Sequence, residues 1–345
     1  MGSSLRIIFL LISLSAFATS AKQLTKYWEY EETPADAHLL MTTTIDAQTL
    51  HRAITKAIDK GDFDEARMYI NIGKEHGYGL YYDQYQQQLN EQDTNARRIR
   101  DNVGNFVNGF VSGKGSSGAG IAGAVTSDFT VVGDIRDLHT QYTHYQKNEP
   151  VDKLVATLSG VGIGLTALAI GTAGSAVPAK AGVSLVKMAK KTRKLTAPFQ
   201  KQLLRMANNV FDWDGFIKIT KSGKGMKSLV HAAKKSYHPK AVEPLKKISG
   251  QMNQIQKSSS VLDTLYMMKY IQSTKDLQRL SNLTKKYGKN TRGYLALLGK
   301  AMLRGGKILK KTTAFFISLI SSILSFLFSL IFLFPTKKEK QLKRS

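Results

Sequence analysis

The chain of 345 residues contains no cysteine. Neither disulfide bonds nor thiolate metal sites can therefore stabilise it, and stability has to come from packing or from a membrane. Acidic residues are also scarce: 25 Asp and Glu stand against 50 Lys and Arg, which gives a net charge of +25. A protein of this charge favours anionic partners.

Recognisable catalytic motifs are missing as well. The sequence has no Gly-x-Ser-x-Gly, no His-Glu-x-x-His and no paired carboxylates in an apolar setting. Asp134, Asp137, His139 and His144 lie close in sequence, but their spacing does not place both imidazoles on one helical face. We interpret these residues as helix caps and an Asp–Arg pair, and we predict no enzyme activity, no cofactor and no metal.

The positive charge is concentrated in one block. Residues 1–179 carry 15 basic and 19 acidic residues, residues 180–311 carry 30 and 5, and residues 312–345 carry 5 and 1. Apolar and basic residues alternate at helical spacing within 180–311, which predicts a basic helical domain that binds anionic lipid head groups. The predicted lipid-binding residues are Lys187, Lys190, Lys191, Arg193, Lys194, Lys307, Lys310 and Lys311.

The N-terminus has the pattern of a secretory signal peptide over residues 1–21. Arg6 precedes an apolar run from Ile7 to Phe17, and small residues follow. The pattern predicts cleavage after Ala18 or Ala21. An uncleaved N-terminal anchor is the alternative.

An uncharged apolar run from Ala314 to Phe334 predicts a C-terminal transmembrane helix over 312–334, followed by a basic tail at 335–345. Its serines recur at helical spacing and predict a helix-packing face. This face consists of Ser318, Ser322, Ser325 and Ser329.

A second uncharged run, 154–178, predicts another transmembrane helix within a Gly-rich hydrophobic region at 101–179. Its small residues repeat at the same spacing as the serines and predict a matching face: Gly160, Gly164, Ala167 and Gly171. The alternative is a buried helix of a soluble domain or a hairpin that lies in the membrane interface, because glycine weakens helices in water. The Gly-rich stretch 104–123 matches a dinucleotide fingerprint but lacks a strand before it, so we do not interpret it as a nucleotide site.

Residues 22–100 predict a helical region with a single tetratricopeptide-like hairpin. Apolar residues recur at helical spacing on both sides of Lys60-Gly61-Asp62, where Gly61 turns the chain and Asp62 caps the second helix. The hairpin offers Tyr78, Tyr81, Tyr82 and Tyr85 either to a protein partner or to the core.

The stretch from Ser127 to Leu195 contains VVGDIRDL followed by a Gly/Ala-rich helical block. It resembles a block of uncharacterised bacterial membrane proteins that carry a signal peptide. It is also similar, more loosely, to the segments that precede toxic domains in bacterial polymorphic toxins. The first resemblance implies export and membrane association, with no activity to transfer.

The sequence as a whole predicts an all-α fold: a helical hairpin, Gly-rich hydrophobic segments, a basic helical domain and a C-terminal transmembrane helix. We expect a non-enzymatic structural or interaction protein of the bacterial inner membrane, with its N-terminal region in the periplasm. The expected partners are anionic lipid and a protein bound by the hairpin; nucleic acid has no supporting motif, and a homo-oligomer is left open. The alternative is a membrane-active or pore-forming protein that inserts residues 104–178.

Overall fold

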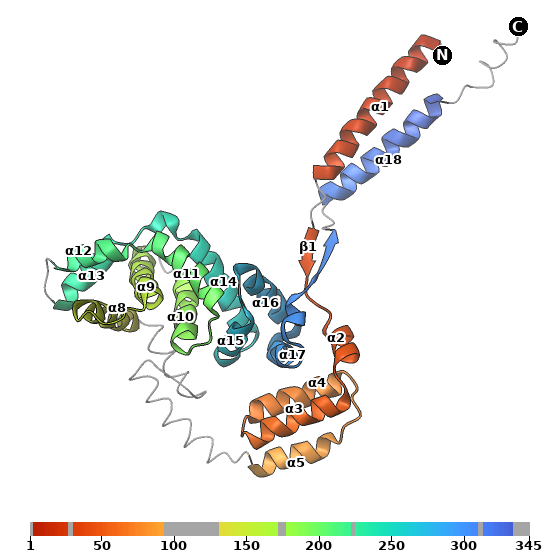
Figure 1. Ribbon diagram of the computed structural model, residues 1–345. Coiled ribbons are helices and arrows are strands. Elements are labelled where there is room, and N and C mark those ends of the chain that lie inside the picture. The colour runs from red at the N-terminus through yellow and green to blue at the C-terminus, as the bar shows by residue number, and fades with distance from the viewer. Residues whose placement is uncertain are drawn as a thin grey trace, which may run out of the picture. The chain divides into compact units, whose positions relative to one another are not determined.

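The computed structural model describes residues 3–26, 30–92, 131–171, 177–221, 225–309 and 313–333. The predicted glycine-rich stretch 104–123, Lys310, Lys311 and the tail 335–345 lie outside these ranges. The described residues are predominantly helical, which confirms the all-α prediction (Figure 1). The chain divides into two compact units: Met1–Thr33 with Gly306–Ser345, and Pro34–Gly305.

Unit 1 joins the two ends of the sequence. Helix α1 (Ser3–Lys26) is followed by strand β1 (Tyr30–Thr33), and strand β2 (Gly306–Leu309) precedes helix α18 (Thr313–Leu333). The strands pair antiparallel, with Tyr30 opposite Leu309 and Thr33 opposite Gly306. Helices α1 and α18 lie side by side beyond this ribbon and run in opposite directions (Figure 1).

Unit 2 is a helical assembly with a continuous apolar core. Its first part contains α2 (Ala37–Thr44), α3 (Ala47–Asp59), α4 (Phe63–Glu75) and α5 (Tyr82–Gln92). Its middle contains α8 (Val131–Gln146), α9 (Lys153–Gly171), α10 (Val177–Lys191), α11 (Ala197–Val210), α12 (Trp213–Lys221) and α13 (Gly225–Lys235). Its last part contains the 3-10 turn η1 (Pro239–Ala241), α14 (Glu243–Ser258), α15 (Val261–Met267), η2 (Met268–Tyr270), α16 (Thr274–Tyr287), η3 (Gly288–Asn290), α17 (Thr291–Leu298) and η4 (Gly299–Leu303).

The predicted hairpin is present as α3 and α4, which pack on each other. Gly61 adopts a φ of +71°, a conformation that side chains disfavour, and the Asp62 carboxylate accepts a hydrogen bond from the Glu65 backbone N–H at 3.1 Å. Tyr78 donates to the backbone oxygens of Met41 and Ile45, whereas Tyr81 is exposed. The tyrosines therefore divide between the core and the surface.

Helix α9 is the central helix of unit 2. It packs against α8, α10, α11 and α13, and its residues from Leu154 to Leu165 are buried by them. The small residues of α9 give space to bulky neighbours: Gly160 lies against the Phe211 ring and Gly164 against the Tyr237 ring. Ala167 is half-buried, and the surroundings of Gly171 lie outside the described side chains.

No helix in the described ranges is both long enough and apolar enough to cross a membrane. The transmembrane helices predicted for 154–178 and 312–334 are therefore not supported by the structure. For the first of them, the apolar residues of α9 are covered by other helices of the same unit, as the alternative prediction of a buried helix requires.

The contacts of the α9 glycines predict that Gly164→Ala destabilises unit 2. A Cβ atom there would lie 2.3 Å from Cγ of Tyr237, so the ring or the helix has to shift at a cost of about 1–3 kcal/mol. Gly250→Ala in α14 is the control, because a Cβ there meets nothing within 4 Å and alanine favours the helix. Thermal unfolding of both variants tests this: equal melting temperatures would contradict the packing described for α9.

Candidate functional site

Helices α1 and α18 display an unusually apolar outer surface. Of nineteen large apolar residues that are exposed in the described part of the chain, fourteen lie on these two helices. They are Ile7, Ile8, Phe9, Leu11, Ile12, Leu14, Phe316, Ile317, Ile320, Ile323, Leu324, Phe326, Leu327 and Phe328. Soluble proteins rarely expose contiguous apolar patches of this kind unless they bind a membrane or a partner.

Serines predominate among the buried side chains of the two helices: four of the five that the structure describes are serines, and the fifth is Phe315. Ser13 and Ser20 of α1 are 5% and 7% exposed, and Ser318 and Ser322 of α18 are both 6% exposed. Ser325 is half-buried, and the side chain of Ser329 lies outside the described set. Of the serines predicted to form a packing face, Ser318 and Ser322 are thus buried and Ser325 is half-buried, and α18 packs against α1 within unit 1.

These serines act through their size. The hydroxyl of Ser322 donates to the Ser318 backbone oxygen at 2.8 Å, and that of Ser13 donates to the Leu10 backbone oxygen at 2.9 Å, so both bonds stay within one helix. The rings of Phe17 and Phe326 contact each other across the interface, with centroids 5.5 Å apart. The small side chains allow the helices to approach closely, as in helix pairs within lipid.

Helix α1 runs without interruption through both predicted cleavage positions, Ala18 and Ala21. Buried residues lie on either side of Ala18, namely Ser13 and Ser20. Cleavage at either position would remove most of the surface that α18 packs against.

The predicted lipid-binding lysines of α10 are engaged inside unit 2. Lys187 is completely buried, with its Nζ atom 2.7 Å from Asp134 Oδ1 and 2.8 Å from Asp137 Oδ2. The prediction that Lys187 contacts lipid is therefore wrong for this fold. Lys190 pairs with Asp152 at 3.2 Å and Lys191 with Asp137 at 2.7 Å, so their charges are also partly neutralised by protein.

The remaining predicted lysines and arginine are placed differently. Arg193 is exposed on a turn with a φ of +57°. Lys194 is half-buried, with its Nζ atom 4.5 Å from the centre of the Tyr266 ring. The backbone of Lys307 belongs to β2, but its side chain is outside the described set, as are Lys310 and Lys311.

Asp134 and Asp137 form the acidic side of a buried ionic cluster between α8 and α10. Lys180 lies 3.5 Å from Asp134, and Arg136 lies 3.3 Å from Asp137, so the predicted Asp–Arg pair is present. Burial raises the pKa of Asp134 above its usual value despite Lys187 and Lys180. Burial also disfavours the charge of Asp137, but Lys187 and Lys191 outweigh it and lower the pKa of Asp137.

The described side chains form no group of three or more His, Asp or Glu residues that could hold a metal ion. His139 and His144 lie on α8 with Asp134 and Asp137, but His144 instead faces Glu149 at 3.7 Å.

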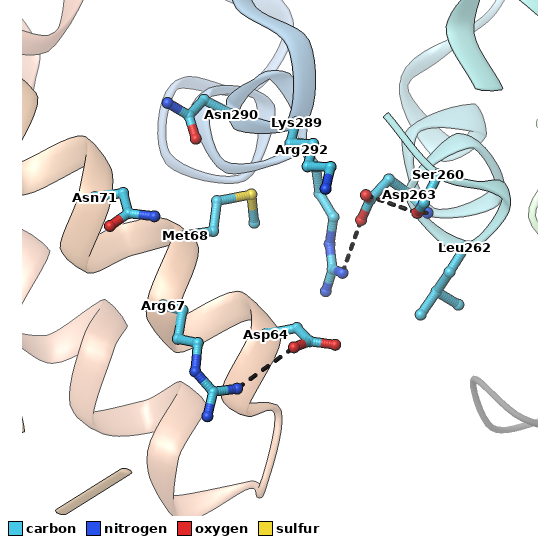
Figure 2. Close-up of a pocket in the computed structure, with 10 residues that line it drawn as sticks. All are labelled: Asp64, Arg67, Met68, Asn71, Ser260, Leu262, Asp263, Lys289, Asn290 and Arg292. Atoms are coloured by element: carbon cyan, nitrogen blue, oxygen red, sulfur yellow. Dashed lines mark hydrogen bonds and ion pairs between the residues drawn. The ribbon is translucent and has the colours of Figure 1, made fainter. Parts of the chain in front are cut away.

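A pocket of about 330 Å³ lies between α4, the start of α15 and the turn before α17. Figure 2 shows Arg292 reaching from α17 toward Asp263, while Arg67 and Asp64 of α4 pair along another wall. Lys289 and Met68 also line the pocket. Its mixture of both charges does not favour an anionic or a cationic ligand.

Arg292 is the structural centre of this region. Its guanidinium contacts Asp62 at 3.1 Å, Glu65 at 2.8 Å and Asp263 at 3.1 Å, and it lies 4.3 Å from the centre of the Tyr266 ring. Burial alone would lower the pKa of Arg292, but the carboxylates raise it above its ordinary value. Arg292 thus fastens the N-terminal hairpin to the C-terminal helices of unit 2.

The pKa values of the two hairpin carboxylates, Asp62 and Glu65, shift in opposite directions. Burial raises the pKa of Asp62, because its desolvation outweighs the charge of Arg292. Glu65 is also penalised by burial, but the Tyr69 hydroxyl donates to it at 2.5 Å and, with Arg292, lowers the pKa of Glu65. All three carboxylates around Arg292 thus bind the same guanidinium, and this arrangement stabilises the packing of unit 2.

Comparison of the chain with protein-family models, with curated proteins and with solved structures gave no match. The resemblance of residues 127–195 to bacterial membrane proteins therefore stays a prediction.

Lys187→Met is expected to destabilise unit 2 by about 3 kcal/mol, because it leaves two buried carboxylates with fewer cations. Asp134→Asn should cost less than Lys187→Met, since Lys187 keeps Asp137 as a partner and an amide retains one hydrogen-bond acceptor. Because the pKa of Asp137 is lowered, its contribution is present above the unfolded-state pKa of about 3.8 and is lost below it. Denaturant unfolding measures the free energy of unfolding of both variants. Equal decreases for Lys187→Met and Asp134→Asn would contradict the role of Lys187 as the cation shared by both carboxylates.

Arg292→Met is expected to cost about 3 kcal/mol, because three partly buried carboxylates lose their shared cation. Arg67→Met, on the same pocket, is the matched control. Its partner Asp64 is 73% exposed at the side chain, so this change should cost less than about 1 kcal/mol. Urea titrations of both variants measure the difference, and similar midpoints would show that Arg292 does not join the parts of unit 2.

Proposed function

We propose that this protein is a non-enzymatic membrane anchor and interaction protein, in which the α1–α18 pair inserts into a lipid bilayer and carries unit 2. One observation carries the proposal: the pair has small residues inside, at Ser13 and Ser322, and large apolar residues outside, at Leu11 and Leu324. In water the apolar side chains would be buried between the helices and polar ones exposed. The reversed order suits hydrocarbon surroundings.

The anchor is favoured over the alternative of a pore-forming protein that inserts residues 104–178. The apolar residues of α9 already have protein neighbours on several sides, and its glycines accommodate aromatic rings of unit 2. Insertion of α9 would require these contacts to break. The α1–α18 pair belongs to unit 1, so its insertion does not use the core of unit 2.

The proposal requires that α1 is retained, as in the alternative of an uncleaved N-terminal anchor. Both helices then enter the bilayer from the end that carries the β1–β2 ribbon. We place the protein in a bacterial inner membrane with unit 2 in the periplasm, because the C-terminal tail is rich in lysine and basic segments favour the cytoplasmic side.

The full-length chain, expressed in a bacterium, should stay in the membrane fraction after alkaline extraction and float with vesicles. Its intact mass should include residues 1–21. Release of the protein by alkali would contradict insertion. Retention of a form that lacks α1 would show that α18 anchors the protein without its partner helix.

The double variant Ile320→Arg/Leu324→Arg should lose retention, because each arginine in hydrocarbon costs about 3 kcal/mol. The control is Leu39→Arg/Val132→Arg in unit 2. Ile320 and Leu324 are 56% and 60% exposed, and Leu39 and Val132 are 60% and 72% exposed. Both double variants therefore add two charges at exposed apolar sites. Equal retention of the two variants in the alkaline extraction would mean that the α18 surface faces water.

A further inference from the structure

Helices α12 and α13 pack on each other, and their basic residues are exposed. In α13 the residues Leu229, Ala232 and Ala233 are buried. Lys227, His231 and Lys234 follow each other at spacings of four and three, which places them on one exposed stripe, and Lys235 lies beside it. Helix α12 adds the exposed residues Lys218 and Lys221.

We define the α12–α13 basic face as Lys218, Lys221, Lys227, Lys234 and Lys235. The described residues give none of these lysines an ion pair, and only Lys221 has a charged-group contact, 5.6 Å from the centre of the Tyr145 ring. The sequence of α13 contains no acidic residue, and α12 contains only Asp214. The positive charge of this face is therefore not balanced within the two helices.

Helix stability explains only part of this arrangement. Lys234 and Lys235 lie in the last turn of α13, where the helix dipole favours cations. Lys227 lies in the first turn, where the dipole disfavours a cation, and it repels the other lysines of the face. A lysine that costs stability at its position points to an anionic partner.

We infer that the α12–α13 basic face binds the anionic head groups of the bilayer in which the protein is anchored, an inference that rests on the proposed function. Anchoring keeps unit 2 close to the lipid surface, which raises the effective concentration of head groups at the face. Met226, adjacent to Lys227 and 49% exposed, adds an apolar side chain suited to the head-group region. These residues replace Lys187, Lys190 and Lys191 as the lipid-contacting set.

Lipid fits this face better than nucleic acid does. Binding of single strands relies on aromatic side chains that stack on bases, and α13 has no Phe, Tyr or Trp. In α12, Trp213 and Phe216 pack on each other with ring centroids 5.3 Å apart, and Phe216 is buried. Tyr145 beside Lys221 is 37% exposed, but the other lysines of the face contact no aromatic ring among the described residues. Lysines on flexible stems suit diffuse contact with the phosphates of a lipid surface.

The test uses the full-length chain in vesicles, with Met226→Cys as the only cysteine and a fluorescent donor attached to it. An acceptor on lipid head groups reports how close the face lies to the surface. Transfer should be high in vesicles that contain phosphatidylglycerol, lower in pure phosphatidylcholine, and reduced by salt because charges are screened beyond about 8 Å at physiological ionic strength. Lys227→Glu/Lys234→Glu/Lys235→Glu should reduce transfer in anionic vesicles to the neutral level.

The control Lys257→Glu/Lys285→Glu/Lys300→Glu changes the same number of charges at exposed lysines of α14, α16 and η4, and should leave transfer unchanged. Three lost contacts correspond to about a 100-fold weaker surface association. If every variant floats with the vesicles and the charge reversals leave energy transfer unchanged, the head-group inference is overturned and the proposed anchor is not. Failure of all variants to float would overturn the proposed anchor. Loss of binding to a labelled oligonucleotide, with unchanged lipid transfer, would assign the face to nucleic acid.

Discussion

The exposure of large apolar side chains on α1 and α18 is the constraint on which this account depends. Full burial of one such side chain away from water gains about 1.5–3 kcal/mol, and those on the pair are roughly half exposed. Fourteen of them together exceed about 10 kcal/mol, which is comparable with the whole stability of an ordinary domain. Because the two helices approach each other through serines, their large apolar side chains stay on the outside of the pair. Whatever covers these side chains has to come from outside unit 1.

Unit 2 is subject to a different constraint, because a helical fold with an apolar core has to accommodate many cationic side chains. One lysine, Lys187, is accommodated by two carboxylates in its interior, and one arginine, Arg292, by three at the contact of the hairpin with the later helices. Buried ionic groups of this kind contribute specificity of arrangement more than net stability, since desolvation offsets much of their attraction. Other cationic side chains of unit 2 lie on its surface, as in the α12–α13 basic face.

Local patterns in the sequence were sufficient to predict the helical class, the turn at Gly61 and the cap at Asp62. Choices that depend on distant residues were not predictable. Glycines spaced along α9 suit a lipid-embedded helix and equally suit contact with Phe211 and Tyr237, which follow tens of residues later. The burial of Lys187 depends on Asp134, 53 residues away, and the pairing of α1 with α18 joins opposite ends of the sequence. Spacing within one helix carries no information about such contacts.

The orientation of the α1–α18 pair in lipid can be measured residue by residue, because the native chain has no cysteine. Single cysteines at Ile12, Ser13, Ile323 and Ser322 would carry a fluorophore in membranes that contain brominated lipids. We expect strong quenching at Ile12 and Ile323, which are exposed, and weak quenching at Ser13 and Ser322, which are buried in the helix pair. Equal quenching at all four positions would contradict the helix pair, and quenching at none would contradict insertion into the bilayer.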